Sequence, residues 1–325
     1  MRAHAIRIHQ TGGPEVLTWE EVEVGEPGAG EVLLRQTAIG LNYIDTYHRS
    51  GLYPLPLPCG IGLEAAAVVE RVGPQVDDWQ VGDRVAYASA PIGAYAERRV
   101  HSASRLVRIP PGVSDQQAAA MLLQGMTAEY LIRRTFAVRA GQWVLFHAAA
   151  GGVGLIACQW LKHLGARVIG TAGGAQKMAL AGAHGCEHVL DSHGQGLAAQ
   201  VRELTGGDGV AVVYDGVGKE TFLTSLDSLA RRGMLVSFGN ASGPVPAFDP
   251  AMLGARGSLF LTRPSLLDYT FTREELQASA AALFAVVAQG VVTIEVRQSY
   301  ALRDAAQAHR DLEGRRTTGS TVLLP

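Results

Sequence analysis

Residues 144–157, VLFHAAAGGVGLIA, decide the fold of this chain. They read as an apolar strand, a turn of small residues and a helix start, which is the order of a dinucleotide-binding fingerprint. Gly151 and Gly154 take its second and third glycine places, and Ala149 takes the first, so the turn has to tolerate a Cβ there. Free amides and partial positive charge at a helix N-terminus suit a pyrophosphate. We therefore expect a nucleotide cofactor here; the alternative is a tight turn that binds nothing.

Short apolar strands alternate with helical stretches on the C-terminal side of this turn. This rhythm predicts βαβ units, and hence an α/β fold with a Rossmann-type, doubly wound parallel sheet. The expected strands are residues 143–146, 167–169, 188–190, 210–214 and 234–238.

The chain before about residue 110 has a different character. Alternating runs such as 32–38 and 93–100, separated by Gly and Pro, predict a β-rich domain. Ser114 and Gln117 have the spacing of a capping box, which marks a helix start. After residue 260 the pattern is mixed again, and we expect this tail to rejoin the first domain. Its predicted elements are a helix at 274–287, a strand at 294–296, a helix at 303–312 and a strand at 320–323.

Length and composition exclude several classes of protein. A chain of 325 residues favours two domains, and a net charge of -2 without a basic run argues against nucleic-acid binding. No run of ~20 apolar residues predicts a membrane span, and the alternating N-terminus reads as a strand and not as a secretion signal. Three cysteines exclude a disulfide scaffold and suit a reducing compartment. We therefore expect a cytoplasmic protein.

The end of the second strand bears on the choice of cofactor. An NAD site places Asp or Glu there to bind the ribose 2′-hydroxyl, but residues 168–177 contain no acid and end in Lys177. The missing acid removes repulsion of a 2′-phosphate, and Lys177 could neutralise that phosphate. This favours NADPH over NADH. The alternative is that Lys177 is an ordinary solvated lysine.

Seven short stretches together carry a resemblance to one known family. They are residues 12–17, 40–47, 49–54, 124–127, 148–154, 239–243 and 262–266. With them the chain resembles, essentially end to end, the zinc-independent quinone oxidoreductases, the ζ-crystallin-like branch of the medium-chain dehydrogenase/reductase superfamily. The resemblance implies a GroES-like catalytic domain from residues 1–125 and 265–325, a Rossmann NADPH-binding domain at 126–264, a ligand cleft between them, and a homodimer.

The resemblance also implies site residues, carried over by position. The side chains expected to line the substrate site are Asn42, Tyr47, Tyr53, Tyr130 and Arg263. Those expected to contact NADPH are Asn42, Thr127, Ala150, Gly151, Gly152, Val153, Gly154, Gly173, Lys177, Phe238, Gly239 and Arg315.

Two positions depart from the family pattern. Asp191-Ser192-His193 stands where the family often has Asn-Tyr-Arg, and an inward-pointing Asp191 would repel a phosphate. Ala67 replaces a common glycine, where we expect only a local packing adjustment.

The sequence predicts no metal site. Zinc-dependent relatives place Cys and His where this chain has Asn42 and Leu63, and neither of these is a normal zinc ligand. Four further residues of types that bind metals lie close together in the sequence: His184, Cys186, His188 and His193. They are predicted to lie on a helix end, a strand and a loop, so their side chains should diverge.

Without a metal, charge that develops on a carbonyl oxygen needs preorganised hydrogen-bond donors. The candidates are Tyr53, Tyr47 and Arg263. Tyr53 is the first choice and Tyr47 the second, because a phenol stays protonated at neutral pH and can donate. Each tyrosine could instead be a buried aromatic whose hydroxyl bonds a backbone carbonyl. The resemblance implies quinone reduction. The alternatives are reduction of enals or enones, one-electron transfer to quinones, and a weakly catalytic NADPH-binding protein.

Overall fold

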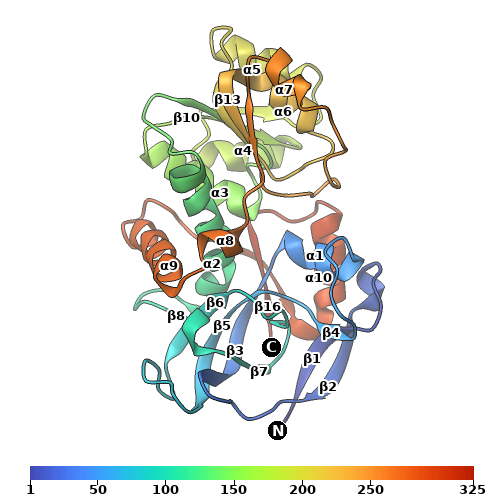
Figure 1. Cartoon of the computed structure of the whole chain (residues 1–325), viewed down its shortest axis with the longest axis vertical. Coiled ribbons are helices and arrows are strands. Elements are labelled where there is room, and N and C mark those ends of the chain that lie inside the picture. Colours follow the sequence, from blue (N-terminus) through green and yellow to red (C-terminus); the bar gives the residue numbers. More distant parts are fainter. The chain divides into compact units, whose positions relative to one another are not determined.

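The glycine-rich turn belongs to a six-stranded parallel sheet in the computed structural model, which describes residues 1–325 (Figure 1). Every neighbouring pair of strands is parallel. From β9 the chain adds strands first on one side of the sheet and then on the other, so the strand order reverses beside β9. This confirms the predicted doubly wound Rossmann-type sheet. The strand order is β11 (His188–Asp191), β10 (Arg167–Ala172), β9 (Trp143–Phe146), β12 (Val210–Asp215), β13 (Leu229–Ser237) and β14 (Phe260–Thr262).

The helices that alternate with these strands cover an apolar sheet. Leu145, Ile169 and Val213 are fully buried in its core. Strands buried on both faces need continuous apolar runs, which is why they stand out in the sequence. The helices are α3 (Gly152–His163), α4 (Ala175–Ala183), α5 (Leu197–Leu204), α6 (Phe222–Ser228) and α7 (Ala251–Ala255).

The remaining strands form two mostly antiparallel sheets. One has the order β2 (Thr18–Glu23), β1 (Arg2–Ile8), β4 (Cys59–Gly60). The other has seven strands: β15 (Val296–Ala301), β16 (Ser320–Leu324), β3 (Glu31–Leu41), β5 (Glu64–Val72), β6 (Arg84–Ala88) and β8 (Val107–Arg108) in order, with β7 (Arg98–Ser102) also on β3.

The C-terminal tail rejoins the N-terminal part of the chain, as predicted. Thr321 pairs with Leu41 in the antiparallel ladder between β16 and β3. Ile8, Leu34 and Ile39 are fully buried in the core of this β-rich part. The other helical elements are η1 (Pro14–Val16), α1 (Tyr43–Ser50), η2 (Ala103–Arg105), α2 (Asp115–Tyr130), η3 (Leu131–Thr135), α8 (Leu266–Tyr269), α9 (Arg273–Ala288), η4 (Leu302–Asp304) and α10 (Ala305–Glu313).

Two compact units make up the chain. The first comprises residues 1–124, 270–284 and 294–325, and the second comprises residues 125–269 and 285–293. Helices α2 and α9 each begin in the first unit and end in the second. None of the helices combines the length and the apolar character that spanning a bilayer requires.

Some elements differ from the sequence predictions. The strand predicted near 294–296 exists but has other bounds, because β15 starts at Val296 and continues to Ala301. Residues 93–97 form no strand, although Ala96 makes a single bridge to Ala5. Helix α1 and strand β14 were not predicted, since each is short. The capping box before α2 is confirmed: Gln117 N donates to Ser114 Oγ at 3.2 Å, and Ser114 N to Gln117 Oε1 at 3.1 Å.

Helix α3 packs closely on the turn that precedes it, because Gly154 has no side chain. A Cβ at Gly154 would lie 2.5 Å from the Ala148 carbonyl oxygen and 2.7 Å from that of Ala149. Both are backbone atoms, so the contact could be relieved only by moving the helix or the turn.

Gly154→Ala should therefore lower the free energy of unfolding by about 1–3 kcal/mol, through overpacking. Gly182→Ala is the matched control, because Gly182 lies in α4 and its Cβ would meet only Val189 Cγ2, at 3.9 Å. Alanine there should be neutral or stabilising by up to ~1 kcal/mol. Urea denaturation measures both variants, and equal stabilities would contradict the close packing of α3.

Candidate functional site

The turn between β9 and α3 has an unusual backbone conformation at Ala148. Its φ of 54° is left-handed, and its carbonyl oxygen accepts a hydrogen bond from Gly151 N at 2.9 Å. Ala149, at the first glycine place of the fingerprint, is fully buried and has no positive φ. The fingerprint tolerates alanine at position 149 because the preceding residue takes up the left-handed conformation.

The first turn of α3 provides unpaired backbone donors. The first i→i−4 bond of the helix runs from Leu155 N to Gly151 O at 2.9 Å. The amides of Gly152, Val153 and Gly154 come before that bond and have no partner within the helix. Such a helix N-terminus attracts anions, so the turn fits the pyrophosphate of a dinucleotide. Ala150, also predicted here, is buried beside them.

Three predicted cofactor residues lie at two other strand ends of the same sheet. Gly173 follows β10, and Lys177 is half-buried in the first turn of α4. Phe238 follows β13, and its ring packs on that of Phe146, with centroids 5.9 Å apart. The carboxyl ends of parallel strands lie along one edge of a sheet, so the structure brings these residues to the same edge as the glycine-rich turn.

The segment that departs from the family pattern lies beside Gly173. A Cβ on Gly173 would be 2.9 Å from His193 Nε2 and 3.3 Å from Ser192 Oγ. Asp191 is exposed, and its Oδ1 accepts a hydrogen bond from His193 N at 3.0 Å. The carboxylate is therefore used to close its own turn.

Arg263 and Gly239 are also predicted site residues, and they touch each other. Arg263 Nη1 donates to Gly239 O and to Ser237 O, each at 3.0 Å. This nitrogen stabilises the loop after β13, a role that the sequence did not indicate.

Tyr130 and Thr127, both predicted, lie near the end of α2 and are buried. The Tyr130 ring stacks on Tyr269, with centroids 4.4 Å apart and an interplanar angle of 12°. Burial raises the pKa of Tyr130, so its phenol is neutral. Tyr269 was missed because it is distant in sequence. Arg315, predicted to contact the cofactor, belongs to the first unit, where it follows α10 with a φ of 56°.

A group of tyrosines lies on and after α1 in the first unit. The Tyr47 ring is 5.2 Å from that of Tyr53 and 5.8 Å from that of Tyr43, measured between centroids. Tyr53 N donates to Tyr47 O at 3.0 Å, which holds the segment after α1 against the helix. The structure thus brings the two predicted donors together, and adds Tyr43 beside them.

Asn42 sits at the N-terminus of α1, where other side chains hold it. Its Nδ2 donates to Glu64 Oε2 at 2.6 Å, and its Oδ1 accepts from Gln124 Nε2 at 3.2 Å. Asn42 also forms a capping box with Asp45, whose backbone N–H donates to the Asn42 side chain, so three of the four hydrogen bonds that an amide can make are used. Burial raises the pKa of Glu64 to about 8, although Asn42 and the Leu123 amide donate to it.

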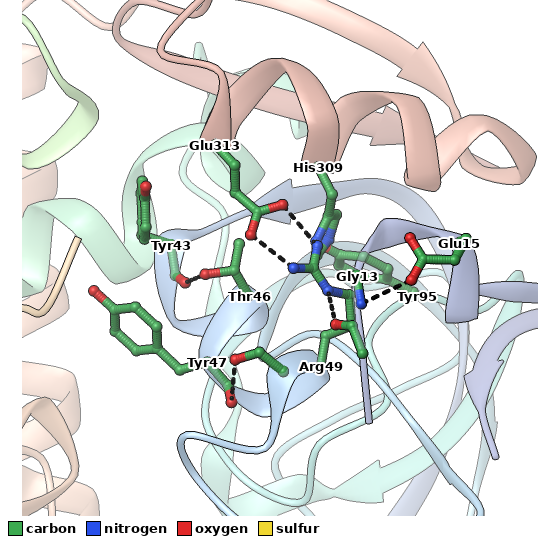
Figure 2. Close-up of polar contacts among 11 residues, drawn as sticks. Gly13, Glu15, Tyr43, Thr46, Tyr47, Arg49, Tyr95, His309 and Glu313 are labelled. Carbon is green, nitrogen blue, oxygen red and sulfur yellow. Dashed lines mark hydrogen bonds and ion pairs between the residues drawn. The ribbon is translucent and has the colours of Figure 1, made fainter. Parts of the chain in front are cut away.

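Arg49 anchors the other end of α1, as Figure 2 shows. Its Nη2 donates to Glu313 Oε1 at 2.6 Å, Nη1 to Glu313 Oε2 at 2.9 Å and to His309 Nδ1 at 3.1 Å, and Nε to Gly12 O at 3.1 Å. The Tyr43 and Tyr47 rings lie on the opposite side of the helix (Figure 2). The ion pair therefore fixes the orientation of the tyrosines without occupying their side of α1.

A chain of hydrogen bonds continues from Arg49 to Asp45. Arg49 only donates, so His309 Nδ1 accepts, and burial keeps this imidazole neutral by lowering its pKa to about 3. His309 Nε2 is therefore protonated and donates to Tyr95 Oη at 3.1 Å, and Tyr95 Oη donates to Asp45 Oδ2 at 2.9 Å. Asp45 Oδ2 also accepts from Asn42 N at 2.9 Å, whereas its Oδ1 is buried without a partner.

No group of three or more His, Cys, Asp or Glu side chains is arranged to hold a metal ion. The four ligand-type residues that looked close in sequence have separate surroundings. His184 Nδ1 bonds the Leu180 carbonyl oxygen at 2.8 Å, Cys186 is buried, His188 stacks on Trp143, and His193 lies against Gly173.

Comparisons with known proteins agree with this architecture. Residues 28–135 match the alcohol dehydrogenase GroES-like domain, and residues 152–285 match the zinc-binding dehydrogenase family. A quinone oxidoreductase of Pseudomonas aeruginosa is 52% identical over 324 residues, which is 99% of this chain and 100% of the relative. A 2-haloacrylate reductase of Burkholderia sp. is 48% identical over 328 residues and covers 98% of both chains.

A solved structure is equally similar. Escherichia coli quinone oxidoreductase complexed with NADPH matches with a TM-score of 0.98 and 48% identity, over 99% of this chain and 100% of that one. The fold and these matches define a dehydrogenase with a GroES-like domain and a nucleotide-binding domain. Within that class, the chain belongs to the zinc-independent quinone oxidoreductases of the medium-chain dehydrogenase/reductase superfamily.

Asp45 should make stability depend on pH. Burial raises its pKa from 3.8 to about 7, so the folded protein holds more protons than the unfolded chain between these values. The stability of the native protein relative to Asp45→Asn should therefore fall by a few kcal/mol as pH rises from about 4 to 7. Urea unfolding at several pH values measures this. Asp208→Asn, at an exposed position, should run parallel to the native protein, and a parallel Asp45→Asn curve would contradict the prediction.

Proposed function

We propose that this protein is an NADPH-dependent reductase of quinones. The observation that carries the proposal is the turn between β9 and α3, where left-handed Ala148 and glycine at 154 let three helix amides point off the end of the sheet. A metal-free group of tyrosines in the β-rich unit supplies hydroxyl donors. The Escherichia coli relative complexed with NADPH supports the choice of cofactor.

The cofactor residues have separate tasks. The amides of Gly152, Val153 and Gly154 bind the pyrophosphate, and Lys177 neutralises the 2′-phosphate. NADPH, when bound, supplies the hydride. Asp191 does not oppose the phosphate in this proposal, because its carboxylate is exposed and solvent screens its charge, while its Oδ1 is bonded to the His193 amide. The remaining proposed contacts are Asn42, Thr127, Ala150, Gly151, Gly173, Phe238, Gly239 and Arg315.

The substrate oxygen receives hydrogen bonds from phenols. Tyr53 and Tyr47 donate to the oxygen as negative charge develops on it, and their ring contact holds both in place. Asn42 orients the nicotinamide, supported by its bonds to Glu64 and Gln124. Tyr130 and Arg263 line the substrate site in this proposal.

Reduction of a conjugated carbonyl compound is the second candidate. The 2-haloacrylate reductase of Burkholderia sp., which matches this chain along its whole length, favours it. The same phenols could donate to the carbonyl oxygen of an enal or enone. A weakly catalytic NADPH-binding protein is the third candidate, which needs the glycine-rich turn but no donors.

The domain limits, assembly and location are parts of the same proposal. The GroES-like domain comprises residues 1–125 and 265–325, and the Rossmann domain comprises 126–264. A homodimer is supported by β14, an edge strand with Phe260 56% exposed, which another copy of the chain could cover. A cytoplasmic location is supported by three cysteines that are all unpaired thiols.

A substrate panel tests the function. Oxidation of NADPH and of NADH should be followed with 1,4-benzoquinone, 9,10-phenanthrenequinone and 2-hexenal under the same conditions. We expect the quinones to be reduced with the higher kcat/KM, and NADPH to be preferred. Faster reduction of 2-hexenal would favour the second candidate, and tight NADPH binding without turnover would favour the third.

Tyr53→Phe tests the phenol donors. Removing one preorganised donor should lower kcat by about 10- to 100-fold while leaving the Kd of NADPH near that of the native protein. Tyr47→Phe should have a smaller effect of the same kind. Tyr300→Phe is the matched control, because its hydroxyl donates to Asp311 Oδ2 and lies outside the proposed site. An unchanged kcat in both Tyr53→Phe and Tyr47→Phe would exclude the phenols as donors.

A further inference from the structure

A buried chain of polar side chains crosses the middle of the parallel sheet. It begins at Asp215, the last residue of β12, whose Oδ1 accepts hydrogen bonds from Val217 N at 2.8 Å and Gly218 N at 3.0 Å. Its Oδ2 accepts from Ser225 Oγ in α6 at 2.7 Å. Asp215 thus holds the loop after β12 and fixes Ser225.

The chain continues through His147 to the glycine-rich turn. Ser225 Oγ is 3.0 Å from His147 Nε2, and His147 Nδ1 is 3.1 Å from Thr171 Oγ1, on β10. Thr171 Oγ1 accepts from Ala148 N at 3.3 Å. All four side chains are at most 2% exposed. A continuous path therefore leads from the carboxylate of Asp215 to the residue that has the left-handed conformation.

The donors determine the direction of every bond. Ser225 has one hydroxyl proton and gives it to Asp215, so His147 Nε2 must donate to Ser225. Burial lowers the pKa of His147 and keeps the ring neutral, so Nδ1 accepts from the Thr171 hydroxyl. The Thr171 oxygen is then left to accept from Ala148 N. Each group has the partner it needs, and no two donors face each other.

Three of these side chains come from adjacent strands or their ends, where the strand order of the sheet reverses, and Ser225 comes from α6. His147 directly follows β9, Thr171 lies on β10 to one side, and Asp215 lies on β12 to the other. Dinucleotides bind at such a reversal point in open parallel sheets. A left-handed alanine costs about 1–2 kcal/mol, so Ala148 needs support from its surroundings.

We propose that Asp215, Ser225, His147 and Thr171 form a positioning relay that holds Ala148 in its left-handed conformation and so presents the α3 amides to the pyrophosphate of NADPH. This inference rests on the proposed function. It adds that four side chains that do not contact NADPH help to determine the affinity for it. It is not a hydrolytic triad, because Ser225 is fully buried and donates to the carboxylate instead of the imidazole.

Ser225→Ala breaks the relay at its centre. It leaves His147 Nε2 buried without an acceptor, which drives the imidazole and then Thr171 to rearrange. We expect the Kd of NADPH, measured by isothermal titration calorimetry, to rise about tenfold. Ser228→Ala is the matched control, because Ser228 is equally buried in the same helix but bonds only the Thr224 carbonyl oxygen, at 2.7 Å. Its Kd should stay within about twofold of the native value, whatever its Tm.

Thr171 provides a second test that does not depend on α6. Thr171→Val keeps the shape but removes the hydroxyl, and should weaken NADPH binding as Ser225→Ala does. Thr171→Ser keeps the hydroxyl and should restore a Kd near that of the native protein, although it loses a buried methyl group. A loss of affinity that followed Tm across all variants, the Ser228 control included, would overturn the relay.

The outcome for the native protein separates the two proposals. If it binds NADPH and both Ser225→Ala and Thr171→Val bind with the same Kd, the relay is wrong and the proposed function stands. If the native protein shows no NADPH binding, the proposed function fails, and the relay fails with it.

Discussion

The close approach of α3 to the end of β9 is the constraint on which the rest of the nucleotide-binding unit depends. Gly154 allows the approach because any Cβ there would meet the carbonyl oxygens of the turn. The turn passes beneath the helix with one residue, Ala148, at a positive φ. A helix start placed in this way directs its unpaired amides and its partial positive charge to one point.

In the β-rich unit, an ion pair and not a glycine fixes the position of a helix. Helix α1 has eight residues, which is too short to be stable alone, so tertiary contacts must hold it. Arg49 does this through a bidentate bond to Glu313 in α10 and a third bond to His309. Arg49 is buried and the Glu313 side chain is 35% exposed, and such an ion pair adds little net stability but defines one arrangement. The arrangement it defines sets the direction of the tyrosines on α1.

The chain's relatives show that this fold does not select a substrate. A quinone oxidoreductase and a 2-haloacrylate reductase each match almost the whole chain at about half identity. Function therefore depends on the side chains presented by the shared framework. In the proposed function, the phenol cluster suits any acceptor that gains negative charge on oxygen, and the amides of α3 suit the dinucleotide that reduces it. On the same proposal, the choice between a flat quinone and a smaller conjugated carbonyl compound depends on the residues around Tyr47 and Tyr53.

The sequence by itself determined the doubly wound sheet, the return of the tail to the first domain and the place of the glycine-rich turn. These follow from local signals: apolar runs, the period of the helices, and glycines at fixed spacing. Only the tertiary structure decided that Ala148 has the left-handed conformation, that Ser225 meets His147 across 78 residues, and that Arg49 meets Glu313 across 264. Such pairs leave no periodic trace, because packing of distant elements, and not local propensity, brings them together.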